Sequence, residues 1–242
     1  MTEIIITYPV DKQLCDPSVS FSNAITRSSH GLSLSEKRIL MLAVSKLDSM
    51  KHFDQGESPT VRLTAKEYAE IFDVNSDIAY EQLIAAGKEL NQRKITFFSQ
   101  SKNEQEQLKL PLAISWVGDY KYHEGKGRAE LRFWHEVIPY LMDLSSHFTT
   151  YKLRHASKLK SLYTWRMLEI FSQYKKNHWI EISVSEFRHA MDVPEKMANN
   201  YDYIRRRIIE PSMRELQKNI GLIIKFKPIK TDRKITSLRF EY

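Results

Sequence analysis

Helical periodicity in the hydrophobic positions begins at several points along the chain, and three of these points carry the same N-terminal signal. Ser33, Thr64 and Ser183 are each followed three residues later by a glutamate. In such a capping box the hydroxyl oxygen accepts a backbone N–H, and the glutamate bonds back to the first residue. The pattern therefore predicts helices that begin close after each of these three residues.

The first half of the chain mixes helical runs with strand-like runs. Residues 1–30 hold short β-like stretches, IIITY and VSFSNAI, without a helical period. Helices are expected over about 33–47, 64–72 and 79–93. Strands are expected at 60–63, 95–98, 112–122 and 128–134, with a Glu-Gly-Lys-Gly turn at 124–127.

The same order of elements returns in the second half. The expected elements are a helix at 157–176, an extended segment at 179–182, a helix opened by Ser183, a helix at 200–218, and strands at 222–227 and 235–241. With an offset of 119, residues 61–74 overlay 180–193 with three identities in fourteen. The repeated order and the overlay indicate an internal duplication.

Helix, short strand, helix, helix and β-hairpin is the order of a winged helix. In such a unit the second helix of the helix-turn-helix enters the major groove of DNA, and the hairpin contacts the backbone or the minor groove. We therefore expect an α+β fold of two tandem winged-helix domains related by internal duplication, at residues 1–144 and 145–242.

Charge is distributed unevenly between these halves. The 242 residues carry a net charge of +7 and a pI near 9.3. Residues 1–144 hold 17 Lys and Arg against 20 Asp and Glu, a net of −3, whereas residues 145–242 hold 20 against 10, a net of +10. The second half is thus expected to bind a polyanion, although a solvated basic surface is the simpler alternative.

Composition excludes several classes of protein. The single cysteine, Cys15, allows neither an internal disulfide nor a cysteine-based zinc cluster. No run of 18 apolar residues exists to span a membrane, and the N-terminus is a poor signal peptide. The expectation is a soluble cytoplasmic protein that is associated with DNA and needs no cofactor.

Basic side chains gather on the helix predicted at 200–218. At 100° per residue, Asn200, Arg207, Arg214 and Lys218 fall within about 40° of one another, and Arg205 and Arg206 flank the apolar face. The planar guanidinium can hold guanine or clamp a phosphate. Pro211 is expected to kink or split this helix. The alternative is a solvated face with Arg206–Glu210 and Arg207–Glu210 pairs.

The hairpin predicted after this helix is also basic. Lys225 and Lys227 alternate with apolar residues, which gives one basic and one apolar face. Phosphate contacts are expected from Lys227, Lys230, Arg233 and Lys234 around the turn, and from Lys158 and Lys160 at the start of the helix at 157–176.

The corresponding helix of the first half, 79–93, contains Lys88 and Arg93 but no arginine cluster, so this copy is expected to read bases poorly. Its strands are rich in aromatic residues. These aromatic side chains either contact another protein or form the core of the domain, and the sequence leaves both possibilities open.

The chain resembles the iteron-binding plasmid replication initiators, the Rep proteins with two winged-helix domains. The resemblance covers residues 21–242. The residues that carry it are Asn23, Leu32-Ser33-Leu34, Ile114-Ser-Trp116, Tyr122, Gly125, Gly127, Leu131-Arg-Phe133, Ile138-Pro-Tyr-Leu141 with Leu144, Phe148-Thr-Thr-Tyr151, Tyr203 to Pro211, Met213 and Glu215-Leu216.

This resemblance implies different roles for the two domains. The C-terminal winged helix would bind repeated origin sites, the iterons, as a monomer, with Arg205, Arg206 and Arg207 first among the DNA contacts. The N-terminal one would mediate homodimerisation and add DNA contacts. Monomers would open the origin with a host replication initiator and helicase, and dimers would repress the protein's own gene.

Other functions fit less well. The eight histidines form no His-x-His or HExxH motif, and no phosphate-binding GxxxxGK[ST] loop exists, so we expect no enzyme. A tandem winged-helix transcription regulator needs the same DNA-reading parts and stays open. An adaptor for anionic membranes would need bulky apolar residues exposed on a basic helix, whereas the apolar residues of 200–218 are expected in the core.

Overall fold

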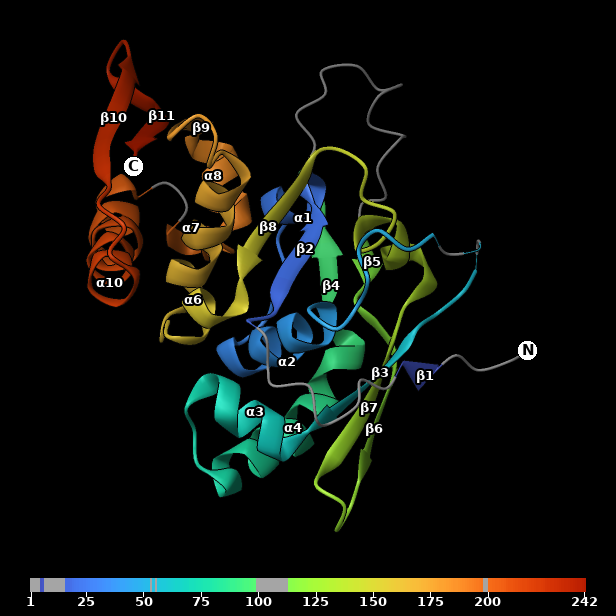
Figure 1. Cartoon of the computed structure of the whole chain (residues 1–242). Coiled ribbons are helices and arrows are strands. Elements are labelled where there is room, and N and C mark those ends of the chain that lie inside the picture. The colour runs from blue at the N-terminus through green and yellow to red at the C-terminus, as the bar shows by residue number, and fades with distance from the viewer. Residues whose placement is uncertain (1–4, 7–15, 53, 55, 99–112, 198–199) are drawn as a thin grey trace.

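The computed structural model describes residues 5–6, 16–52, 54, 56–98, 113–197 and 200–242. Figure 1 shows two winged-helix units on either side of a central group of elements, with the β6–β7 hairpin of the first unit and the β10–β11 hairpin of the second at opposite ends. The fold is α+β, with mixed helices and small sheets, as predicted.

The first unit packs three helices against a four-stranded sheet in the order β1-β3-β7-β6. Its elements are α2 (Leu34–Val44), α3 (Ala65–Phe72), α4 (Ser76–Glu89), β1 (Ile5–Ile6), β3 (Thr60–Thr64), β6 (Val117–His123) and β7 (Arg128–Phe133). The capping box at Ser33 and Glu36 is confirmed in both directions. Thr64 caps α3 as predicted, but the Glu67 carboxylate bonds the Lys46 ammonium at 2.6 Å.

The second unit repeats this arrangement with a three-stranded sheet in the order β10-β11-β9. Its elements are α7 (Leu162–Gln173), α8 (Val184–Ala190), α9 (Tyr201–Tyr203), a π-helical segment (Ile204–Ile209), α10 (Glu210–Ile220), β9 (Trp179–Ser183), β10 (Lys225–Thr231) and β11 (Lys234–Glu241). Ser183 accepts the backbone N–H of Glu186 and so caps α8.

The offset of 119 relates the two units in the structure as well. It places the ends of β3 on the ends of β9 and the start of α3 on the start of α8. Asp73 and Asp192, identical in the overlay, both adopt left-handed backbone, with φ of 50° and 51°. Aspartate is one of the few residues that tolerate this conformation, and here it turns the chain out of the helix.

The remaining elements connect the units. Strand β2 (Ser18–Ser22) pairs antiparallel with β8 (Phe148–Lys152), and β4 (Lys94–Thr96) pairs with β5 (Ala113–Ser115). Short helices α1 (Asn23–Arg27) and α6 (Leu153–Ser157) and 3₁₀ segments at Leu90–Gln92, His135–Tyr140 and Glu195–Met197 complete the order. The β2–β8 ladder joins strands from both sides of residue 144, and the boundary at that residue stays a prediction.

Several of the predicted elements are wrong in part, among them the strand at 112–122, which is divided at Trp116 into β5 and β6. The stretch VSFSNAI is a strand only to Ser22, after which the Ser22 hydroxyl caps α1. The helix predicted at 157–176 is the shorter helix α7, because Ser161 caps it and residue 157 is already the last residue of α6. The strands of the last hairpin were predicted at 222–227 and 235–241. They extend further toward each other, so that the turn holds only residues 232–233.

The aromatic residues of the first unit are mainly core. Trp116 and Phe133 are fully buried, and Phe97 and Tyr120 are buried as well, while Trp134 is partly exposed. This confirms the core alternative for these strands.

A buried polar network joins the two units. The Lys37 ammonium of α2 lies 2.8 Å from Glu169 of α7, and Arg166 lies 2.6 Å from the same carboxylate. Arg166 also donates to the carbonyls of Thr26, Ser28 and Ala190. Because all three charged side chains are buried, removing any one of them would leave a buried charge without its partner.

His30 extends the network and makes stability depend on pH. Its Nε2 lies 3.0 Å from the Ile25 carbonyl and its Nδ1 3.3 Å from the Lys37 ammonium, which fits a neutral ring with the proton on Nε2. Burial, and next the charge of Arg166, hold the pKa of His30 well below its usual value of 6.5. Just below pH 6.5 the His30 ring is therefore protonated in the unfolded chain but stays neutral in the folded chain.

We expect acid to destabilise the chain through His30. Stability from this group is present above pH 6.5 and is lost as the pH falls below it, by at most about 1.4 kcal/mol per pH unit. Urea unfolding of His30→Gln from about pH 7.5 to about pH 5 should lack this slope. The exposed His52→Gln variant should keep it, and a wild-type slope in His30→Gln would rule the assignment out.

Candidate nucleic-acid interface

The predicted DNA helix is continuous from Tyr201 to Ile220 but changes its winding in the middle. The N–H of Glu210 bonds the Arg205 carbonyl five residues earlier, which is π-helical spacing. Pro211 follows in the first turn of α10, where its missing N–H disturbs the hydrogen bonding least. The chain thus accommodates the proline by a wider turn and is not broken there.

This wider turn changes how the three consecutive arginines are presented. Arg205 pairs with Asp202 at 3.2 Å and with Glu210 at 3.4 Å. The predicted alternative pairs of Arg206 or Arg207 with Glu210 are not formed, because the π turn brings Glu210 beside Arg205. Arg206 and Arg207 are exposed and form no ion pair with any residue in the described part of the chain.

The apolar residues of this helix face the core. Ile204, Ile208, Ile209 and Leu216 are buried, and Met213 is half-buried. The burial removes the apolar face that a membrane adaptor would need. Within the described residues, every helix is too short or too polar to serve as a membrane span.

The rest of the predicted stripe is only partly assembled. Arg214 and Lys218 are exposed on α10. The Asn200 side chain accepts the N–H of Tyr203 at 3.0 Å and caps the helix, so it lies at the end of the stripe. Because residues 204–209 are π-helical, the spacing of 100° per residue on which the stripe was predicted does not hold there.

Helix α10 is held to the α6–α7 connection, and this places two predicted lysines. The Glu215 carboxylate accepts the backbone N–H of Lys160 at 2.6 Å, and Asn219 donates to the Lys158 carbonyl at 3.2 Å. Lys158 and Lys160 do not start a helix as predicted but lie in this connection, with exposed side chains beside α10.

The β10–β11 hairpin presents the remaining predicted residues. Lys227, Lys230, Arg233 and Lys234 are exposed, and Phe226 on the other face stacks on Phe240 at 5.1 Å. The predicted division into a basic and an apolar face is therefore confirmed. Asp232 takes left-handed backbone at the turn, which brings Arg233 to the tip.

Two exposed side chains beside this surface were missed by the sequence analysis. Gln217 and Ile223 line a groove of about 340 Å³ between α10 and the chain leading into β10. Neither residue is basic, so a search of the sequence for basic residues does not find them. Ile223 is 68% exposed, and only its position after the helix could have drawn attention to it.

The first unit differs at the equivalent helix. Helix α4 carries exposed Ile78, Tyr80 and Ile84 with acidic neighbours, and it lacks an arginine cluster like that of the second unit. The expectation that the first copy reads bases poorly stays a prediction.

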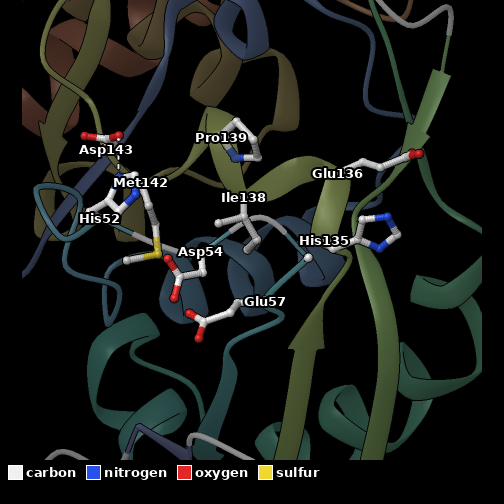
Figure 2. A pocket seen from close by; sticks show the side chains of 10 residues that line it. His52, Asp54, Glu57, His135, Glu136, Ile138, Pro139, Met142 and Asp143 are labelled. Atoms are coloured by element: carbon white, nitrogen blue, oxygen red, sulfur yellow. Dashed lines mark hydrogen bonds and ion pairs between the residues drawn. The ribbon is translucent and has the colours of Figure 1, made fainter. Parts of the chain in front are cut away.

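A pocket of about 640 Å³ lies in the first unit, and Figure 2 shows the side chains that line it. Asp54, Glu57, Glu136 and Asp143 line it, and the His52 ring lies 3.0 Å from Asp143. An acidic lining repels phosphates, so the pocket does not suit a DNA backbone. Among the described residues, no three His, Cys, Asp or Glu side chains are grouped so as to hold a metal ion.

Comparison with known proteins agrees with this geometry. The family model described as "Initiator Replication protein, WH1" matches residues 18–172, and "Initiator Rep protein, WH2" matches residues 183–242. The chain belongs to the initiator replication protein family. Both winged-helix units of that family are therefore present.

Individual members of the family are similar over most of the chain. The "PI protein" of Escherichia coli is 25% identical, covering 91% of this chain and 80% of that protein. A "Replication initiation protein" of Escherichia coli is also 25% identical, covering 91% of this chain and 69% of its own length. The crystal structure of the Pi initiator protein in complex with iteron DNA is 21% identical, with a TM-score of 0.75 over 93% of this chain and 96% of that one.

Proposed function

We propose that this initiator replication protein binds double-stranded DNA at repeated origin sites of a plasmid and starts replication there. The observation that carries the proposal is the pair of exposed arginines, Arg206 and Arg207, without ion-pair partners in the described chain, on the helix that a winged helix presents to the major groove. The similar Pi initiator is bound to iteron DNA in its crystal structure, which supports the same ligand here.

The contacts would divide between bases and phosphates. Arg206, Arg207 and Arg214 would enter the major groove, where a guanidinium can hold guanine. The basic residues around this helix would contact the backbone; they are Lys158, Lys218, Lys227, Lys230, Arg233 and Lys234. Arg205 and Asn200 would support the helix, one through ion pairs and the other as its cap.

The first unit would mediate homodimerisation, and the dimer would repress the protein's own gene. The exposed Ile78, Tyr80 and Ile84 of α4 support a protein contact more than a DNA contact. Residues 1–144 would form this domain and residues 145–242 the main DNA-binding domain. A host replication initiator and helicase would act with the monomer at the origin. Sedimentation velocity over a range of concentrations tests the dimer, and pull-down with purified host proteins tests the partners.

Footprinting on the DNA that flanks the protein's own gene tests the function. Repeated protected sites of one sequence support initiation at iterons, whereas a lone operator at the promoter would favour the transcription regulator. No protection at any concentration would contradict DNA binding itself.

We expect steep dependence of DNA affinity on salt. Each neutralised phosphate lowers log K by about 0.9 per unit of log salt concentration. Lys230→Ala on the hairpin should weaken binding to all sequences alike and reduce the salt slope by about one. A salt titration by fluorescence anisotropy measures both, and a flat titration of the intact chain would exclude a phosphate-binding surface.

A further inference from the structure

The junction of the two units is built from two similar halves (Figure 1). In each half, a short helix that follows a strand of the β2–β8 ladder packs on the first helix of the other unit's helix-turn-helix: α1 packs on α8, and α6 packs on α3. The offset of 119 places Asp73, after α3, on Asp192, after α8. The duplication thus puts two carboxylates at equivalent turns.

Asp192 binds the chain of the first unit. One of its carboxylate oxygens accepts the backbone N–H groups of His30 and Gly31, both at 3.2 Å. The other oxygen accepts the Ser29 hydroxyl. Three consecutive residues that follow α1 therefore hold the turn after α8.

The equivalent turn of the first unit makes no such contact. The Asp73 side chain is exposed and forms no hydrogen bond or ion pair with any residue that the structure describes. Across this half, Arg38 donates to the Leu159 carbonyl at 3.4 Å, whereas Arg166 in the other half donates to the Ser28 carbonyl at 2.6 Å. If the Asp192 contact is lost, no carboxylate at the equivalent turn replaces it.

The Asp192 contact lies at the turn that leads into the helix from Tyr201 to Ile220, which carries the exposed arginines. Next to it, the His189 ring lies 2.7 Å from the Thr96 carbonyl, which can only accept, so the ring donates there. The buried ion pair of Lys37 with Glu169 attaches the units elsewhere, between α2 and α7. Two separate points of attachment resist rotation about either one.

We propose that Asp192 fixes the orientation of the second unit on the first, and with it the position of the DNA helix. Without its carboxylate, three hydrogen bonds across the junction are lost, and the second unit is free to rotate about the α2–α7 contact. A fixed orientation spares the chain the cost of ordering its units on DNA. This consequence for DNA rests on the proposed function, whereas the orientation itself does not.

Distances between spin labels on the two units test the orientation. Cys15→Ser removes the single cysteine, and exposed helix positions then take the labels through Lys66→Cys on α3 and Gln217→Cys on α10. Excess unlabelled chain restricts the measurement to distances within one chain. Double electron–electron resonance should give one narrow peak, and Asp192→Gly should broaden it. Glycine favours left-handed backbone, so this variant removes the carboxylate without straining the turn.

Three further variants make the result specific. Asp73→Gly makes the same change at the equivalent turn, with φ of 50°, and should keep the narrow peak. Asp192→Asn should also keep it, because the amide oxygen still accepts the two N–H groups. Ser29→Ala removes one of the three bonds and should broaden the peak less, and it serves as the test if Asp192→Gly does not fold. An unchanged peak in both Asp192→Gly and Ser29→Ala, or equal broadening in Asp73→Gly, would overturn the inference.

Affinity for the footprinted duplex separates this inference from the proposed function. By fluorescence anisotropy, Asp192→Gly should bind about fivefold or more weakly than the wild-type chain, the lower end of typical coupling between sites. Asp192→Asn and Asp73→Gly should bind like the wild type. If the peak broadens but the wild-type chain binds no DNA, the proposed function fails and the positioning role stands. If the peak broadens and the affinity is unchanged, the consequence for DNA is wrong.

Discussion

Replacing Glu169 with alanine is expected to destabilise the folded chain by about 3–5 kcal/mol. The Glu169 carboxylate is fully buried and accepts from Lys37 at 2.8 Å, Arg166 at 2.6 Å and the Tyr151 hydroxyl at 2.9 Å. Burial raises the pKa of this carboxyl, but the charges of Lys37 and Arg166 outweigh burial and hold it below its usual value. Removing the carboxylate leaves two buried cations without a counter-charge.

Urea unfolding followed by circular dichroism measures this loss against a matched control. Glu67 pairs with Lys46 at 2.6 Å, but both side chains are partly exposed. Glu67→Ala should therefore cost only about 0–1 kcal/mol. Equal losses in the two variants would show that the buried network does not stabilise the junction of the units.

A second substitution tests the cause of the loss. Burial lowers the pKa of Lys37 to about 8, so this lysine is costly to keep charged when its carboxylate is absent. Lys37→Met in the Glu169→Ala background should recover part of the stability, because one of the two uncompensated cations is removed. A further loss of similar size would contradict this account.

The sequence predicts what depends on local signals. The box at Ser33 and the caps at Thr64 and Ser183 are all encoded within a few residues. The two hairpins are also encoded by local signals, and so is the order of elements that recurs in the second half of the chain. These signals are enough to give two winged helices and to place the basic helix and hairpin side by side.

Features that depend on distant contacts were not predictable. Lys37, Arg166 and Glu169 are charged residues that a sequence places on the surface, and Lys37 meets the other two only across the two units. The π segment lies where Ile208, Ile209 and Ser212 are buried, whereas the stripe was predicted at 100° per residue and Pro211 was expected to kink or split the helix. For the same reason the spacing of the stripe through Arg207 and Arg214 was predicted to be more regular than it is. Ile223 was missed because a single apolar residue forms no sequence pattern.

Alanine at Arg206 or at Arg207 is expected to weaken DNA binding by about 1–3 kcal/mol each, which is about 5- to 150-fold. Both side chains are exposed on the turn that the π segment presents, so their loss should leave the free energy of unfolding within about 0.5 kcal/mol. Mobility-shift titration on the footprinted site measures the affinity. Arg205→Ala is the neighbouring control, and it should cost less because Arg205 already pairs with Asp202 and Glu210.

Lysine at the same positions separates base reading from phosphate binding. Lysine keeps the positive charge but lacks the planar fork that holds guanine O6 and N7 together. If Arg206 or Arg207 reads a base, its lysine variant should lose discrimination between the site and random DNA while the salt slope stays unchanged. If it clamps a phosphate, lysine should restore most of the affinity that alanine removes. Wild-type binding by both alanine variants would place the interface elsewhere than on the α9–α10 helix.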